Sequence, residues 1–213
     1  MISATPIVFV VDDDPSVREA LESLIVQAGW RAQVFESAQT FLSFPRASVP
    51  SCLVLDVSLP GLNGLELQSL IAGDRIDMPI IFITGHADVP MTVKAMKAGA
   101  VEFLTKPVAE AVLINAIGSA IARSRVTLDQ EGESQALRSL HAKLTPRERD
   151  VMTLVVRGLL NKQVGGELGM AEITVKAHRG QVMRKMKAAS FADLVNMGAR
   201  LGLASAPKPS RNK

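Results

Sequence analysis

Short, unbroken apolar runs alternate with amphipathic stretches in the first half of the chain. The runs Ile7–Val11, Cys52–Leu55 and Ile80–Ile83 consist of apolar residues throughout. Runs of this kind are typical of parallel strands that are buried on both faces of a sheet. Two further candidate strands, Arg31–Phe35 and Val101–Leu104, are interrupted by polar residues, which is typical of strands at the edges of a sheet.

Helical patterns lie between these strands. After Asp14 and Pro15, apolar residues recur at i, i+3, i+4, i+7, i+8 and i+11, and Gly29 follows the last of them. Asp14 can cap this helix, because aspartate is favoured at the N-cap and proline at the next position. The alternation predicts an α/β domain with a doubly wound, five-stranded parallel sheet in the flavodoxin-like order 2-1-3-4-5.

The second half of the chain has a helical period throughout. A capping box at Thr145–Glu148 marks the start of a first helix, which Gly158 ends. The later helices are predicted over Lys162–Leu168 with Asn161 as N-cap, Glu172–Met186, and about Phe191–Leu201. A short helix, a glycine turn and a helix with a basic outer face form a helix-turn-helix pattern, so we predict an all-α domain of four helices.

Charge divides the chain in a similar place. Residues 1–122 hold 7 basic and 13 acidic residues, and residues 123–213 hold 17 basic and 8 acidic ones, within a total charge of +3. The basic half favours a nucleic-acid partner. We predict one domain over 1–122, a partly helical linker over 123–142 broken near Gly132, a helix-turn-helix domain over 143–204 and a disordered tail over 205–213.

Composition excludes several classes of protein. Among 213 residues, Cys52 is the only cysteine, which rules out an intramolecular disulfide or a cysteine-rich zinc site. No run approaches the 18 apolar residues that suggest a membrane span, and the first residues do not resemble a signal peptide. The expected location is the cytoplasm, with no membrane partner.

Polar side chains follow the predicted strands at their carboxyl ends, which meet in one crevice in a doubly wound sheet. Asp12 and Asp13 follow the first strand, Asp56 the third, Thr84 the fourth and Lys106 the fifth. Clustered carboxylates favour a hard cation such as Mg²⁺, lysine and hydroxyl groups bind phosphoryl oxygens, and an aspartate can act as a nucleophile toward phosphorus. Each residue alone has an ordinary explanation as a cap, turn or surface residue, but the combination favours a phosphoryl site.

The motifs at these positions resemble those of a two-component receiver domain over roughly residues 5–122. They are Val10–Asp13, Leu53–Asp56, Leu59–Gly64, Ile83–His86 and Phe103–Pro107. The resemblance implies that Asp56 accepts phosphate from the phosphohistidine of a histidine kinase. It also implies that Asp13, Asp56 and the backbone carbonyl of Ser58 bind Mg²⁺, with Asp12 acting through water. Thr84 and Phe103 match the family's switch pair, and Lys106 matches its phosphoryl-binding lysine, followed by a cis peptide bond.

A second resemblance covers roughly residues 138–203. The segments Leu144–Arg149, Gly158–Val164 and Thr174–His178 are similar to a LuxR-type DNA-binding domain. The resemblance places Lys176 and Ala177 at base-reading positions, whereas Gly180 offers no side chain. The candidate DNA-binding residues are Lys162, Thr174, Lys176, Ala177, Arg179 and Arg184. Gly165 and Gly166 replace an alanine-rich pair, so we expect a soft second helix.

The two resemblances together imply a response regulator of the FixJ/NarL subfamily. We predict a transcriptional regulator that forms a homodimer on phosphorylation and binds double-stranded promoter DNA, with RNA polymerase as a further candidate partner. It would be no enzyme beyond its own phosphoryl transfer and dephosphorylation. A phosphatase would need a second acid where the chain has Ser58, and a small-molecule sensor would need an apolar pocket in place of the carboxylates.

Overall fold

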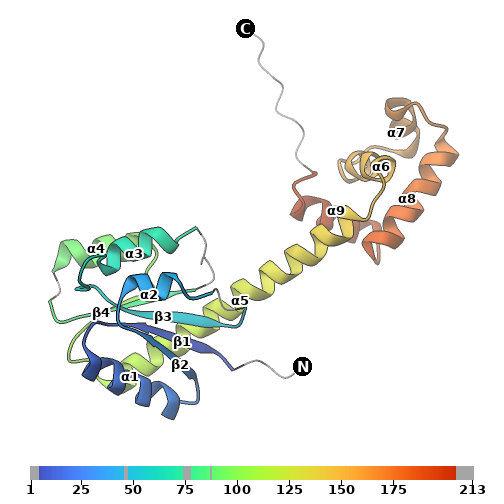
Figure 1. Ribbon diagram of the computed structural model, residues 1–213. Coiled ribbons are helices and arrows are strands. Elements are labelled where there is room, and N and C mark those ends of the chain that lie inside the picture. Colours follow the sequence, from blue (N-terminus) through green and yellow to red (C-terminus); the bar gives the residue numbers. More distant parts are fainter. Residues whose placement is uncertain (1–4, 46–47, 74–77, 87, 205–213) are drawn as a thin grey trace, which may run out of the picture. The chain divides into compact units, whose positions relative to one another are not determined.

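The computed structural model describes residues 5–45, 48–73, 78–86 and 88–204, so the predicted disordered tail over 205–213 lies outside the described residues. The chain divides into two compact units, Met1–Gln130 and Glu131–Lys213, called here the N-terminal and C-terminal units (Figure 1). Within the described ranges, none of the helices combines the length and apolarity that crossing a bilayer requires.

The N-terminal unit contains the predicted parallel sheet. Its strands are β1 (Ile7–Val11), β2 (Arg31–Phe35), β3 (Ser51–Asp56), β4 (Ile80–Thr84) and β5 (Glu102–Thr105). The strand order is β2-β1-β3-β4-β5 and all neighbouring pairs are parallel. The predicted order is therefore confirmed, and the two strands with polar interruptions lie at the edges of the sheet.

Helices cover both faces of this sheet. They are α1 (Pro15–Gln27), α2 (Ala38–Leu42), α3 (Gly64–Ile71), α4 (Val89–Lys97) and the first part of α5 (Glu110–Ala142). Asp14 caps α1 as predicted, because its side chain accepts a hydrogen bond from the Ser16 amide at 2.8 Å. Gly29, just after α1, has a φ of +88°, a conformation that glycine adopts without steric cost.

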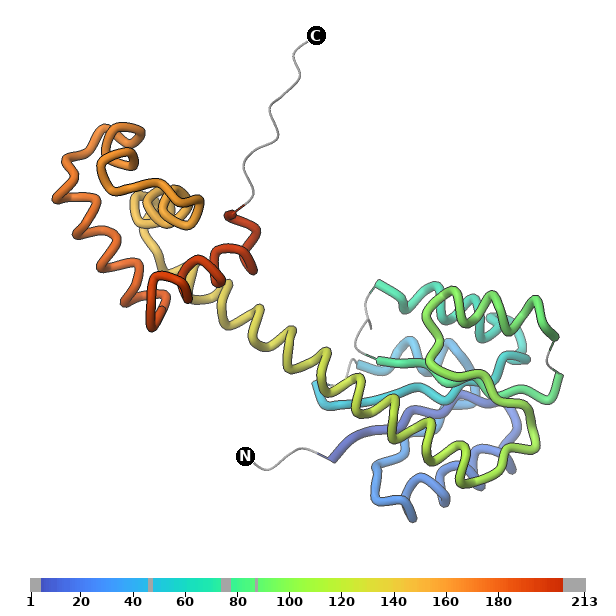
Figure 2. The backbone as a smooth tube through the Cα atoms, turned by 180° about the vertical axis from the view of Figure 1, so that it is seen from behind, coloured from blue at the N-terminus to red at the C-terminus, as the bar shows by residue number. Residues whose placement is uncertain are grey.

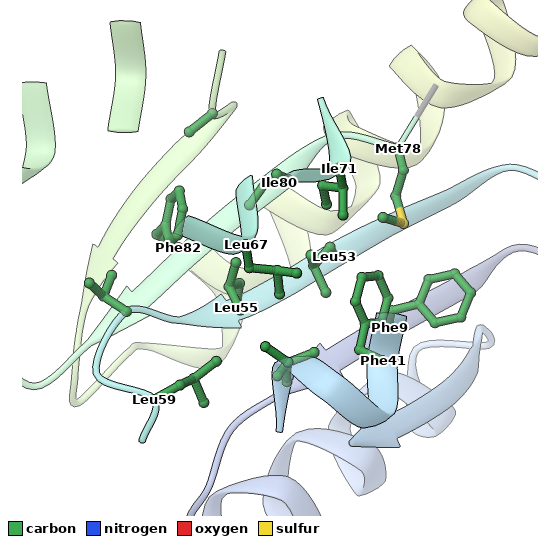
Figure 3. Packing of buried hydrophobic residues seen from close by; sticks show 14 of the residues in the cluster. Phe9, Phe41, Leu53, Leu55, Leu59, Leu67, Ile71, Met78, Ile80 and Phe82 are labelled. Carbon is green, nitrogen blue, oxygen red and sulfur yellow. The ribbon is translucent and has the colours of Figure 1, made fainter. Parts of the chain in front are cut away.

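Burial on both faces explains the apolar runs of the inner strands. One face carries Phe9 of β1 and Leu53 of β3 and packs against α2, α3 and α4 (Figure 3). The other face carries Val8 of β1 and Cys52 of β3 and packs against α1 and α5, whose backbones lie on the same side of the strands in Figure 2. Cys52 is fully buried there, and burial raises the pKa of its thiol.

The predicted break in the linker is wrong, because α5 is helical from Glu110 to Ala142 and includes Gly132. One glycine costs a helix only about 1 kcal/mol relative to alanine, and the segment contains no proline. Packing stabilises both parts of the helix, since Ile117 is buried in the N-terminal unit and Leu137 in the C-terminal unit. Ser124 adds a buried hydrogen bond by accepting from the Ser51 amide at 3.0 Å.

The C-terminal unit contains the four predicted helices together with the last part of α5. They are α6 (Pro146–Val156), α7 (Asn161–Leu168), α8 (Glu172–Met186) and α9 (Phe191–Arg200). Thr145 caps α6 within the predicted capping box. The predicted capping role of Asn161 is wrong: Leu160 is the N-cap residue of α7, and the Asn161 Oδ1 instead accepts a hydrogen bond from Arg179.

The two glycines inside α7 differ in their surroundings. A Cβ on Gly165 would lie 2.6 Å from the Met170 carbonyl oxygen, whereas a Cβ on Gly166 would meet open space. Gly165 is therefore needed for the close approach of the turn after α7.

Gly166→Ala should raise the free energy of unfolding of the C-terminal unit by about 1 kcal/mol, and Gly165→Ala should lower it by roughly 2 kcal/mol. Hydrogen exchange of α7 peptides in the full-length protein measures both changes, and equal protection in the two variants would contradict this account.

Candidate functional site

Three carboxylates meet at the carboxyl ends of β1 and β3. One oxygen each from Asp12, Asp13 and Asp56 lies within 4.8 Å of the others. Asp12 is fully buried and Asp56 is 5% exposed, while Asp13 faces solvent. The sequence predicted this grouping, since Asp12 and Asp13 follow the inner strand β1 and Asp56 ends the inner strand β3.

Lys106 lies between two of these carboxylates. Its Nζ is 2.6 Å from Asp12 Oδ2 and 2.8 Å from Asp56 Oδ2. The peptide bond between Lys106 and Pro107 is cis, as the receiver resemblance implied. The Lys106 amide donates to the Thr84 carbonyl at 2.8 Å, which fixes the end of β5 against β4.

The electrostatics of the crevice follow from burial and from this lysine. Burial raises the pKa of Asp12, and this effect exceeds the lowering caused by hydrogen bonds from Lys106 and from the Asp14 amide. Partial burial opposes the charged form of Lys106, but hydrogen bonds and charges of Asp12 and Asp56 outweigh it and raise the pKa of Lys106. Lys106 therefore stays a cation among three acidic side chains. An oxygen-rich cluster with excess negative charge fits a hard divalent cation.

Backbone and side-chain donors orient both buried acids. The Asp14 amide donates to Asp12 Oδ1 and the Ser58 amide donates to Asp56 Oδ1, each at 3.0 Å. Arg18 of α1 donates from Nη1 to the Asp12 backbone carbonyl at 2.7 Å. The sequence does not reveal this contact of Arg18, because nothing in the local pattern shows that its side chain reaches back to the end of β1.

Gly64 packs closely against the backbone of Asp56, the candidate phosphoacceptor. A Cβ at this position would be 2.5 Å from the Asp56 carbonyl oxygen, 3.0 Å from Val57 Cα and 3.1 Å from Phe82 Cε1. The Gly64 amide also donates to the Val57 carbonyl at 3.1 Å. The first residue of α3 thus packs against the backbone that carries Asp56, and only glycine leaves room for this approach.

The candidate switch residues lie on the two neighbouring strands. Thr84 is fully buried, and its hydroxyl donates to the His86 carbonyl at 3.1 Å and accepts from the His86 amide at 3.2 Å. Phe103 is half-buried, with its ring centroid 5.9 Å from that of Phe82. The switching role of this pair stays a prediction.

In the C-terminal unit, the candidate DNA-binding residues fall into two groups. Five of them are exposed: Lys162, Thr174, Lys176, Ala177 and Arg184. Arg179 is only half-exposed, with its Nη1 3.2 Å from Asn161 Oδ1 and its guanidinium carbon 4.2 Å from the centroid of the Phe191 ring. Arg179 therefore connects α8 to the start of α7 and to α9. Its predicted contact with DNA stays a prediction.

Glu148 holds α6 against α8, the helix that carries all of the DNA-binding candidates except Lys162. Its carboxylate accepts from the Thr145 amide and from Lys185 Nζ of α8, both at 2.7 Å, and the residue is 5% exposed. The sequence predicted the capping box but not the lysine, which is 37 residues away. Burial raises the pKa of Glu148, but the hydrogen bonds from Lys185 and Thr145 lower it by more. The pKa therefore lies below its ordinary value of 4.5.

Glu148→Gln should therefore reduce the free energy of unfolding of the C-terminal unit by about 2 kcal/mol at pH 7. A carboxylate with a lowered folded-state pKa stabilises the fold above its unfolded-state pKa, and this contribution disappears as pH falls through the folded-state value. The difference between wild type and variant should thus shrink below about pH 4.5. Hydrogen exchange of α6 and α8 peptides in the full-length protein tests this. Asp150→Asn is the control, because its ion pair with Arg147 is long and exposed; an equally large effect there would contradict the assignment.

Comparison with known protein families agrees with both halves of the structure. Residues 8–118 match the response regulator receiver domain. Residues 142–198 match the bacterial regulatory proteins of the luxR family. The first match contains the carboxylate cluster and Lys106, and the second contains α6 to α8 and most of α9.

Similarity to individual proteins extends over nearly the whole chain. Nodulation protein W of Bradyrhizobium diazoefficiens is 50% identical over 203 residues, which cover 95% of this chain and 89% of that protein. The transcriptional regulatory protein FixJ of the same organism is 38% identical, with 92% of this chain and 96% of FixJ covered. Among solved structures, the response regulator StyR is 46% identical, with a TM-score of 0.82 and coverage of 92% of this chain and 100% of that one. The chain therefore belongs to the two-component response regulators that join a receiver domain to a LuxR-type DNA-binding domain, and it is a phosphorylation-dependent transcriptional regulator.

Proposed function

We propose that Asp56 is the phosphoacceptor, that a sensor histidine kinase supplies the phosphoryl group, and that Mg²⁺ is the cofactor. The observation that carries this proposal is the position of Asp56, whose two carboxylate oxygens are held by the Ser58 amide and by Lys106 beside two further acids. In the proposed reaction a carboxylate oxygen of Asp56 forms a bond to phosphorus while the bond from phosphorus to the imidazole nitrogen of phosphohistidine breaks.

The residues around Asp56 have complementary roles in this transfer. Lys106 is close enough to exchange one carboxylate partner for a phosphoryl oxygen, and the Thr84 hydroxyl can exchange His86 for another. Asp13, Asp56 and the Ser58 carbonyl would hold the Mg²⁺, with Asp12 acting through water, and the ion would neutralise charge on the phosphoryl group. The burial of Asp12 and Asp56 strengthens each of these interactions, because water screens them less.

A phosphodonor experiment tests this assignment. Full-length protein incubated with acetyl phosphate and Mg²⁺ should gain one phosphoryl group, observed by intact-mass spectrometry, and chelation with EDTA should prevent the gain. Labelling at an unchanged rate in EDTA would contradict the role of the cation. We propose no enzymatic activity beyond the protein's own phosphoryl transfer and dephosphorylation, so sustained turnover of a generic phosphomonoester would contradict that part.

The output proposed for this chemistry is a homodimer. Helix α4 presents the apolar residues Val89, Val93 and Met96, which are 76%, 44% and 42% exposed. Phosphorylation would change the arrangement of Thr84 and Phe103 and thereby favour contact between the α4 helices of two molecules. The two C-terminal units of this dimer would then bind two half-sites of promoter DNA. The protein would act in the cytoplasm, with RNA polymerase as a further partner.

Light scattering tests the proposed dimer. Beryllofluoride, which mimics the phosphoryl group, should raise the mass of the wild type toward that of a dimer, and Met96→Glu should prevent this by placing charge in an apolar contact. Val26→Glu is the control, since Val26 is 56% exposed on α1, away from α4. A dimer that forms normally in Met96→Glu would contradict the use of this face.

A further inference from the structure

Helix α8 exposes a large apolar side chain where a solvated helix would have a polar one. Ile173, in the first turn of α8, is 73% exposed. The core-facing residues of the helix are Val175, Val182 and Met186, all fully buried. At 100° per residue, Ile173 lies about 200° from Val175 and therefore points away from the core of the C-terminal unit. Nothing in the packing of that unit accounts for an isoleucine at this position.

Ile173 begins a row of residues along the outer face of α8. The row has the spacing i, i+4, i+7, i+11 and is called here the outer row: Ile173, Ala177, Gly180 and Arg184. All four residues are exposed. The first three have no polar side-chain atom, so the beginning of the outer row is unable to form hydrogen bonds to base edges. The contact that it offers is apolar.

Basic residues stand beside this apolar segment. Lys176 and Arg184 are exposed on the same side of the helix, and Lys187 follows at the end of α8. Positive side chains of this kind bind DNA phosphates, and lysine also binds the acceptor groups of guanine in the major groove. Helix-turn-helix proteins insert the first residues of this second helix into the major groove, whose floor presents one apolar group, the 5-methyl group of thymine. An isoleucine in the first turn matches that group in chemistry and in position along the helix.

We propose that Ile173 is a specificity-determining residue that contacts a thymine 5-methyl group in the major groove, and that Ala177 extends this apolar contact by one turn. The half-site would then contain T·A pairs opposite the first turn of α8. Gly180 contributes no side chain, so discrimination at the next position depends on the flanking Lys176. The proposal rests on DNA binding by the C-terminal unit and is independent of the chemistry of Asp56.

Replacing thymine by deoxyuridine tests this contact, because the exchange removes only the methyl group. Full-length protein, with and without beryllofluoride, first selects binding sites from a random DNA pool at low salt. Each thymine of the selected half-site is then replaced singly, and affinity is measured by fluorescence anisotropy. Removing one buried methyl group should weaken wild-type binding about four-fold at the contacted position, since it costs about 0.8 kcal/mol and 1.4 kcal/mol is ten-fold.

Variants assign the effect to the side chain. Ile173→Ala should bind the thymine and deoxyuridine sites with nearly equal affinity, and Ile173→Val should keep part of the difference. Leu160→Ala should keep all of it, since Leu160 is 70% exposed but lies outside α8. None of these changes should alter the dependence of affinity on salt, because no phosphate contact is lost. Lys162→Ala, by contrast, should reduce that dependence.

The outcomes separate this proposal from DNA binding itself. Wild-type affinity that is unchanged by deoxyuridine at every thymine would overturn the proposal while leaving sequence-specific binding intact. A methyl dependence that persists in Ile173→Ala would also overturn it, by assigning the contact to another residue. Failure to select any sequence from the pool would contradict DNA recognition by the C-terminal unit, and with it the proposal.

Discussion

Asp56→Asn should abolish phosphorylation by acetyl phosphate and leave the fold intact. The amide is a poor nucleophile and a poorer ligand for a divalent cation than the carboxylate. The Asn side chain also has only one acceptor oxygen, whereas the two oxygens of Asp56 accept from Lys106 at 2.8 Å and from the Ser58 amide at 3.0 Å. Intact-mass spectrometry after incubation with acetyl phosphate and Mg²⁺ should show one phosphoryl group on the wild type and none on the variant.

Asp14→Asn is the matched control for this experiment. Asp14 lies two residues from Asp12 and caps α1, and asparagine is an equally good N-cap residue. This variant should be labelled like the wild type. A phosphoryl group on the Asp56 variant in the wild-type amount would show that another residue accepts phosphate.

Gly64→Ala should destabilise the N-terminal unit by about 3 kcal/mol, because the new methyl group would collide with backbone atoms that have no freedom to move aside. The Asp56 carbonyl oxygen would lie 2.5 Å from the added carbon. Urea unfolding followed by the fluorescence of Trp30 reports this change, since Trp30 is the only tryptophan of the chain and packs against the core of this unit. In molecules that remain folded, the added methyl group beside the Asp56 backbone should also slow the phosphorylation of Asp56.

Gly118→Ala provides the comparison in the same unit. Gly118 lies within α5, and a Cβ there would meet open space. This variant should be as stable as the wild type or more stable by up to about 1 kcal/mol. If both alanine variants unfolded at the same urea concentration, the close contact at Gly64 would not limit stability.

Much of the fold and part of the site follow from local sequence patterns. The apolar runs predict inner strands because burial on both faces leaves no polar alternation, and the carboxyl ends of parallel strands bring Asp12, Asp56 and Lys106 together. Packing between distant segments is not visible in such patterns. The continuity of α5 through Gly132 depends on contacts at both of its ends. From its position in the sequence, Asn161 is expected to cap α7, but its side chain accepts a hydrogen bond from Arg179 instead.

Three further residues have roles that local sequence patterns do not reveal. Glu148 was identified through a capping box, which is a local motif, whereas its ion pair with Lys185 joins helices that only the folded unit brings together. Arg18 reaches the backbone of Asp12 across the start of α1, and its helical position alone does not reveal where a long, flexible side chain ends. Ile173 has no recognisable role in the sequence alone, because an isolated isoleucine at a helix start is informative only once its exposure is known.

The position of Lys106 between Asp12 and Asp56 has a consequence for the resting protein. Two buried acids share one internal cation, so their mutual repulsion is already partly cancelled without a bound ion. The N-terminal unit should therefore remain folded in EDTA, unlike small domains that need a metal to fold. In the proposed reaction, the ammonium group can exchange the Asp56 carboxylate for the new phosphoryl group while it stays paired with Asp12, so that neither anion lacks a counter-charge.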